Sequence, residues 1–269
     1  YDVLHMPNGH VVSLRVRSLV GLIPLFAVET LEPELLDQLP NFRRRMNWFL
    51  QYRPHLVENI ASLTRPGKGG RLLLALADQD QLTQVLKRML DPDEFLALYG
   101  IRSLSKYHQA HPYTFYVDGE NYTVRYEPGV SRTGLFGGNS NWRGPIWFPT
   151  NYLMIESLRK YHLYYGDDVT VEMPRGSGKQ MTLSGAAEAL SQRLADLFRL
   201  GEGDQRPAHG DVAMFREDPH CHNLVLFHEY FHAETGEGLG ANHQTGWTAL
   251  VAKLLQECAG GETCVHWRA

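Results

Sequence analysis

The sequence is poor in cysteine and lacks a long apolar run. Its three cysteines form an odd, sparse set that does not make a disulfide framework, so we expect a reducing, cytoplasmic setting. The longest apolar run, residues 19–28, has ten residues and includes a proline, whereas about 18 or more are needed to span a bilayer. We therefore predict a protein without a transmembrane segment. The cysteines are Cys221, Cys258 and Cys264.

An excess of positive charge is also missing. The 269 residues carry 26 Lys and Arg against 30 Asp and Glu, which gives a net charge of −4. A nucleic-acid-binding protein usually has a basic balance or a basic stripe. Here the one basic run, Arg43 to Arg45, is interpreted as a solvated helix face, and no nucleic-acid partner is expected. With 43% hydrophobic and 21% charged residues, the chain is typical of a globular protein of one large or two ordinary domains.

Turn and periodicity signals predict a mainly α-helical protein with two β-hairpins. One hairpin is expected over residues 3–14, with Asn8-Gly9 in a type I′ turn, and one over residues 114–126, with Asp118-Gly119 as the turn. Strands and helices do not alternate, which argues against a doubly wound parallel sheet. Helices are expected over residues 15–30 with a break at Pro24, 32–52 with an interruption at Pro40 and a cap at Asn41, 79–90, 150–165, 182–200 and 245–259, with loops over 127–146 and 201–211.

Polar and aromatic side chains concentrate in residues 135–152, LFGGNSNWRGPIWFPTNY. Trp faces can stack on sugar rings, while Asn and Arg supply the few oriented hydrogen bonds that a polar ligand needs. Arg143 beside an acidic group would also form a fork-like ion pair. The alternative is a loop that packs its own aromatic residues onto the helix behind it.

A second group of chemically active side chains lies in residues 228–251, HEYFHAETGEGLGANHQTGWTALV. Glu229 stands beside Tyr230 and Phe231, where a partly apolar pocket would tune its pKa and let it act as a general base on water. A glycine-rich turn follows, and Trp247 stands at the start of the next expected helix. The alternative is an exposed glutamate at a helix end.

The same segment contains the zinc-protease signature H-E-x-x-H at residues 228–232. On a helix, His228 and His232 would share a face and bind zinc, with Glu229 as the base and a distant Glu257 or Glu262 as third ligand. The longer metzincin pattern fails, and the glycine-rich run would end such a helix early. A zinc hydrolase is therefore kept as an alternative.

Taken together, the two segments resemble glycoside hydrolase family 63 and its mannosylglycerate-hydrolase-like relatives. The NWRGPIW run at 141–147, followed by a helix that opens with NYL, resembles the sugar-binding loop of that family. The EYF run at 229–231, the glycine-rich run and TGWTALV at 245–251 resemble its general-base segment. Trehalases have a related layout.

The resemblance implies an (α/α)₆ barrel of six helical hairpins. Residues 1–269 would be the C-terminal portion of one catalytic domain, a partial barrel with small β-hairpins in its loops. The implied reaction is inverting hydrolysis of an α-glycosidic bond by two carboxyl groups about 6.5–9.5 Å apart, with no cofactor. Glu229 would be the general base, with Glu237 as second choice. The carbohydrate substrate would contact Asn139, Asn141, Trp142, Arg143, Trp147 and Trp247.

One part of the family pattern has no match in the sequence. The general acid of the family is an Asp in the first half of the barrel, and no segment here resembles it. The chain also begins at Tyr1 in a strand-like pattern, so we expect a piece of a longer protein that is weakly active by itself. A non-catalytic carbohydrate-binding or helical domain is the other alternative, and the sugar itself is not readable from the sequence.

Overall fold

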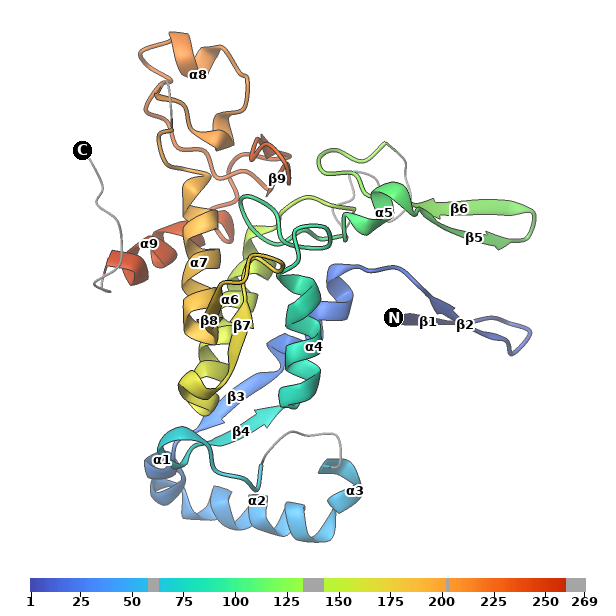
Figure 1. Ribbon diagram of the computed structural model, residues 1–269, viewed down its shortest axis with the longest axis vertical. Helices are drawn as coiled ribbons and strands as arrows, with labels where there is room; N and C mark the ends of the chain where they lie inside the picture. Colours follow the sequence, from blue (N-terminus) through green and yellow to red (C-terminus); the bar gives the residue numbers. More distant parts are fainter. Residues whose placement is uncertain (58–62, 133–142, 202–203, 260–269) are drawn as a thin grey trace. The chain divides into compact units, whose positions relative to one another are not determined.

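The computed structural model describes residues 1–57, 63–132, 143–201 and 204–259, which are drawn in colour in Figure 1. Contacts divide the chain into two compact units, and each is described by itself. Unit 1 consists of residues 1–21, 89–152 and 188–269, and unit 2 of residues 22–88 and 153–187. None of the helices in the described ranges has the length and apolarity to cross a membrane.

Unit 2 combines two short antiparallel sheets with helices. β3 (Val28–Leu31) pairs with β4 (Leu72–Ala75), and β7 (Thr170–Glu172) pairs with β8 (Gln180–Thr182). The helical elements wholly or mostly in this unit are η1 (Leu19–Phe26), α1 (Pro33–Gln38), α2 (Pro40–Tyr52), α3 (Pro54–Val57), η2 (Lys68–Gly70), α4 (Gln79–Met89), α6 (Phe148–Tyr165) and η3 (Gly166–Asp168).

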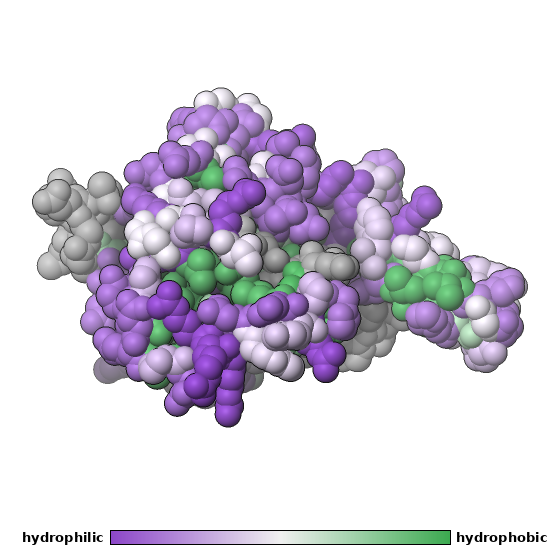
Figure 2. All heavy atoms as spheres, turned by 90° about the horizontal axis from the view of Figure 1, so that it is seen from below, coloured by the Kyte–Doolittle hydropathy of each residue, from purple (hydrophilic) through white to green (hydrophobic). Residues whose placement is uncertain are grey.

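Helices α2 and α4 bury very different amounts of apolar surface. On α4, Leu82 and Leu86 are at most 1% exposed, as the predicted apolar face requires. No residue of α2 is buried, and its Phe42, Trp48 and Tyr52 are each about half exposed. Hydrophobic side chains, in green, also reach the surface on the face drawn in Figure 2.

Unit 1 contains three further antiparallel pairs: β1 (Asp2–His5) with β2 (Val11–Leu14), β5 (Tyr113–Val117) with β6 (Glu120–Val124), and β9 (Tyr230–Phe231) with β10 (Gly238–Leu239). Much of the rest is irregular backbone. The helical elements wholly or mostly in this unit are α5 (Tyr107–Ala110), α7 (Leu183–Asp196), η5 (Pro207–His209), α8 (Met214–Glu217), η6 (Thr248–Leu250) and α9 (Val251–Ala259).

Isolated bridges join three segments of unit 1 side by side, one of which is β9. Arg102 pairs with Ile146, and Ile146 pairs with Phe231, each antiparallel. The Ile146 and Phe231 backbones exchange two hydrogen bonds of 2.9 Å. Segments that are far apart in the sequence are thereby held together next to Trp147 and β9.

Several predicted elements are confirmed. The Asp118-Gly119 turn has φ of +51° and +85° and closes the β5–β6 hairpin, as a type I′ turn requires. Helix α4 matches the predicted 79–90, and α6 ends where Gly166, with φ +67°, stops it. The interruption of 32–52 at Pro40 is also confirmed, by α1 and α2.

Other local predictions are wrong. Residues 15–30 are not one helix, because the chain turns through η1 and then pairs as β3 with the distant β4. The first hairpin has a longer turn, in which Met6 donates to His10 at 2.8 Å and only Gly9 has positive φ. Asn41 lies inside α2 and accepts from Arg44 Nη2, while Leu39 is the cap. Five antiparallel pairs, not two hairpins, lie in the described ranges.

Candidate active site

Glu229 lies at a bend of the backbone directly before β9. Its amide donates to the Leu239 carbonyl at 3.2 Å, and its Oε2 accepts from the Ala241 amide at 3.3 Å. Gly240 has φ +71°, and a Cβ there would lie 2.5 Å from Glu229 Oε2. The glycine therefore leaves the space that the carboxylate occupies, and the side chain of Glu229 is partly exposed.

Two of the predicted tryptophans meet beside this glutamate. Trp147 stacks on Tyr230, with ring centroids 5.1 Å apart, and makes an edge contact with Trp247 at 5.7 Å. Burial raises the pKa of the Tyr230 hydroxyl, and the charge of Glu229 raises it further. The phenol therefore stays protonated close to a charged carboxylate.

Arg143 is buried and ion-paired. Its guanidinium is 1% exposed, and Nη1 lies 3.3 Å from Glu127 Oε2. Glu127 also accepts from the Arg132 amide at 3.2 Å. A Cβ at Gly144 would lie 2.5 Å from the Glu127 carbonyl oxygen, so the glycine permits this close approach. Sequence reasoning foresaw an acidic partner for Arg143 but did not identify Glu127.

Three predicted substrate contacts, Asn139, Asn141 and Trp142, lie outside the described residues. The same holds for Glu262, one of the two third zinc ligands considered above. The other, Glu257, is in an ion pair with Lys253 at 3.2 Å.

The H-E-x-x-H segment is not a helix, so the helical zinc geometry is wrong. Its central residues form β9, and the His232 Nδ1 accepts from the amides of Glu234 and Thr235 at 3.3 and 3.2 Å. Within the described ranges no three His, Cys, Asp or Glu side chains are grouped to hold a metal ion.

His228 is a half-buried side chain within this segment, and both of its ring nitrogens are buried. Neither of its ring nitrogens has a hydrogen-bond partner among the described residues. Burial lowers the pKa of His228, and nearby His209 lowers it further, so the ring is kept neutral.

Glu237, the second choice for a base, lies at the other end of the β9–β10 hairpin from Glu229. The register pairs Tyr230 with Leu239 and Phe231 with Gly238, which leaves Glu237 just beyond the last pair. Glu237 lines a hollow of about 350 Å³ together with Tyr99 and Arg206. The structure therefore does not bring the two glutamates together along this hairpin.

Comparison with known proteins identifies the family of the chain. The profile of the mannosylglycerate hydrolase MGH1-like glycoside hydrolase domain matches residues 71–248, which is more than half of the chain and includes Glu229, Trp147 and Trp247. The chain is 51% identical to the uncharacterized protein YMR196W of Saccharomyces cerevisiae over 269 residues, 99% of this chain and 24% of that protein.

More distant relatives have names that state a substrate. The mannosyl-oligosaccharide glucosidase of Saccharomyces cerevisiae is 26% identical over 186 residues, which cover 68% of this chain and 16% of that protein. A probable mannosyl-oligosaccharide glucosidase of Schizosaccharomyces pombe is 27% identical over 181 residues, 67% of this chain and 16% of that protein. The chain thus spans a quarter or less of the length of these relatives.

Proposed function

Because the chain belongs to the MGH1-like glycoside hydrolase family, we propose that it is part of an enzyme that hydrolyses an α-glycosidic bond with inversion. The substrate is a small glycoside or an oligosaccharide. Residues 1–269 then form the C-terminal portion of one (α/α)₆ catalytic domain. The observation that carries the proposal is the partly exposed Glu229 carboxylate, held by a backbone amide within the residues that match the family.

Glu229 is the general base in this mechanism. Its carboxylate takes a proton from a water molecule, which attacks the anomeric carbon on the face opposite the leaving group. A second carboxyl group protonates the departing glycosidic oxygen. Among the described residues the Glu229 carboxylate accepts one amide hydrogen bond, which leaves lone pairs available for that water.

Two buried glutamates of unit 1 are poorly suited to be the general acid. Glu94 lies against Arg17 Nη1 and accepts from the Ser105 hydroxyl, and Glu127 pairs with Arg143. Both carboxyl groups are already bound to buried partners, whereas a general acid must face the departing glycosidic oxygen. This supports a general acid elsewhere in a longer polypeptide.

The aromatic and polar residues of the 139–147 loop bind the sugar in this proposal. Trp147 and Trp247 form the apolar side of the site together with Tyr230, and Asn139, Asn141 and Trp142 complete it. Arg143, buried against Glu127, supports this loop from behind. The contact between Trp147 and Tyr230, the residue after Glu229, supports a common site for base and binding loop.

The test uses the full-length polypeptide, a panel of α-glucosides and α-mannosides, and the variant Glu229→Gln. We expect the variant to lose about 10²- to 10⁴-fold in turnover, because it keeps the shape of the base but cannot take a proton. Calorimetry should show that sugar binding survives. NMR of the first product anomer should report inversion.

Glu237→Gln is the matched control, since it changes a glutamate of the same hairpin. Equal losses in the two variants would point to a damaged hairpin instead of a lost base. Unchanged turnover in Glu229→Gln would refute the assignment and favour a non-catalytic carbohydrate-binding domain.

A further inference from the structure

Arg102 is a buried residue on one of the three bridged segments of unit 1. It is 3% exposed, and its amide donates to the Phe95 carbonyl at 2.8 Å. Its backbone pairs with Ile146, the residue before Trp147, and Ile146 pairs with Phe231, two residues after Glu229. The backbone of Arg102 is therefore bridged directly to the segment of Trp147 and, through Ile146, to the segment of Glu229.

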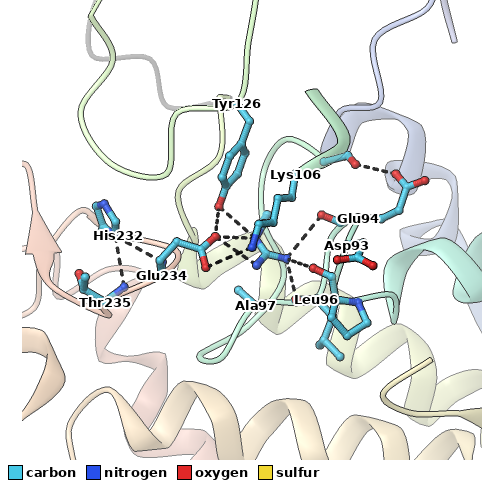
Figure 3. A network of polar contacts seen from close by, with 12 residues as sticks. Asp93, Glu94, Leu96, Ala97, Lys106, Tyr126, His232, Glu234 and Thr235 are labelled. Atoms are coloured by element: carbon cyan, nitrogen blue, oxygen red, sulfur yellow. Dashed lines mark hydrogen bonds and ion pairs between the residues drawn. The ribbon is translucent and has the colours of Figure 1, made fainter. Parts of the chain in front are cut away.

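The guanidinium of Arg102 binds two different segments, which are represented by the labelled Leu96 and Glu234 in Figure 3. Nη1 donates to the carbonyls of Leu96 and Pro92 at 2.6 and 3.0 Å. Nε and Nη2 lie 3.3 and 3.2 Å from Oε1 of Glu234, within the loop of the β9–β10 hairpin. Nη1 of the guanidinium therefore binds the 92–96 loop, while Nε and Nη2 bind the hairpin.

Tyr126 closes this network from a third segment. Its hydroxyl accepts from Arg102 Nε at 3.0 Å and donates to Glu234 Oε1 at 2.5 Å. Lys106 Nζ lies 4.0 Å from the other carboxylate oxygen of Glu234. Burial raises the pKa of Glu234, but the Tyr126 hydrogen bond and the charges of Arg102 and Lys106 outweigh it and lower the pKa overall.

This network holds the hairpin that carries Glu229. The Glu229 carboxylate itself accepts one described hydrogen bond, from an amide of the same hairpin, so its place depends on where the hairpin lies. Near the tip, the Ala233 amide donates to the Pro128 carbonyl at 2.9 Å, and Glu234 is bound to Arg102. A displacement of about 1 Å at a reacting group can cost about 10²-fold in rate.

We propose that Arg102 is the positioning residue of the active site, which fixes Glu229 through Glu234 and Trp147 through Ile146. The inference rests on the proposed function. A lysine cannot replace the guanidinium of Arg102. Its ammonium is a compact point charge, which cannot donate to the 92–96 loop and to Glu234 at the same time as the planar guanidinium does.

The experiment compares Arg102→Lys with Arg193→Lys in the full-length polypeptide. Arg193 is a matched control, since its Nη1 also donates to two loop carbonyls, those of Ala97 and Leu98, at 2.8 and 2.9 Å. Within the described ranges its hydrogen bonds go to that loop and not to the hairpin. We expect Arg102→Lys to lower kcat about 10- to 100-fold with KM changed less than about threefold. Arg193→Lys should leave both constants near the wild-type values.

A double-mutant cycle separates positioning from a general loss of stability. Glu234→Gln should lower kcat by itself. The double variant Arg102→Lys with Glu234→Gln should have a kcat close to that of Arg102→Lys alone, because both substitutions break the same contact between Arg102 and Glu234. Hydrogen exchange should speed up at the amides of residues 232–237 in Arg102→Lys and not in Arg193→Lys.

The possible failures are distinguishable. If wild-type protein hydrolyses no α-glycoside, the proposed function fails and the positioning role fails with it. If wild-type protein is active but Arg102→Lys and Arg193→Lys have the same kcat, or the losses in the double variant add fully, only the positioning role is overturned.

Discussion

At the scale of single residues, the Arg143–Glu127 ion pair determines how the segment around Gly144 is held. Both side chains are less than a tenth exposed, so water does little to screen the two charges. Glu127→Gln should therefore destabilise the protein by about 3 kcal/mol, since it removes a buried negative charge that lies against the Arg143 guanidinium. Urea unfolding of the full-length polypeptide, followed by tryptophan fluorescence, measures this.

Asp196→Asn is the control for that prediction. Asp196 pairs with Arg199 at 2.8 Å, and its side chain is 43% exposed. Loss of such a surface pair should cost less than about 1 kcal/mol. A similar loss of stability in both variants would contradict a special role for the buried pair.

His228 makes stability depend on pH. Its pKa in the folded protein is below the ordinary 6.5, because burial disfavours the charged ring. The unfolded chain therefore binds more protons in the window just below pH 6.5, and stability falls as the pH drops through it. His228→Gln should flatten this dependence in unfolding experiments between pH 5 and 7.5.

Part of the pH dependence of the free energy of unfolding should remain in His228→Gln. The pKa values of His108 and His209 are also lowered by burial, so both contribute in the same direction. An identical pH dependence in wild-type and His228→Gln protein would show that His228 is protonated equally in both states.

At the scale of elements, the β9–β10 hairpin depends on Gly240. Its φ of +71° and the closeness of Glu229 Oε2 leave no room for a side chain. Gly240→Ala should displace the carboxylate and lower kcat about 10²-fold on the proposed mechanism. Gly246→Ala is the control, since among the described residues no atom beyond its two chain neighbours lies within 4 Å of its Cβ position, and it should change kcat less than about threefold.

The elements that sequence predicted well are those with strong local signals. Asp118-Gly119 and Gly166 adopt the left-handed conformations that end or reverse a segment, and α4 has an apolar face with helical period. The elements that it missed need a distant partner. β3 forms because β4 is available 41 residues or more further along, and β9 is a strand although H-E-x-x-H is usually met on helices.

At the scale of the whole molecule, the chain spans 24% of the length of its yeast relative and presents an unburied helix, α2. We expect the 269-residue chain alone to have at most about 1% of the turnover of the full-length polypeptide, because the general acid is proposed to lie outside it. Assays of both proteins on the same α-glycoside check this. Full turnover by the chain alone would contradict it.

The sequence by itself determined the family and singled out Glu229 as the candidate base. Trp147, Glu229 and Trp247 stand in motifs whose residue types and order resemble those of the family, and the family match covers them. It did not reveal Arg102, Glu127 or Glu234, which are ordinary charged residues with no local pattern. Only tertiary structure decided their roles, because burial and the meeting of distant loops turn such charges into specific partners.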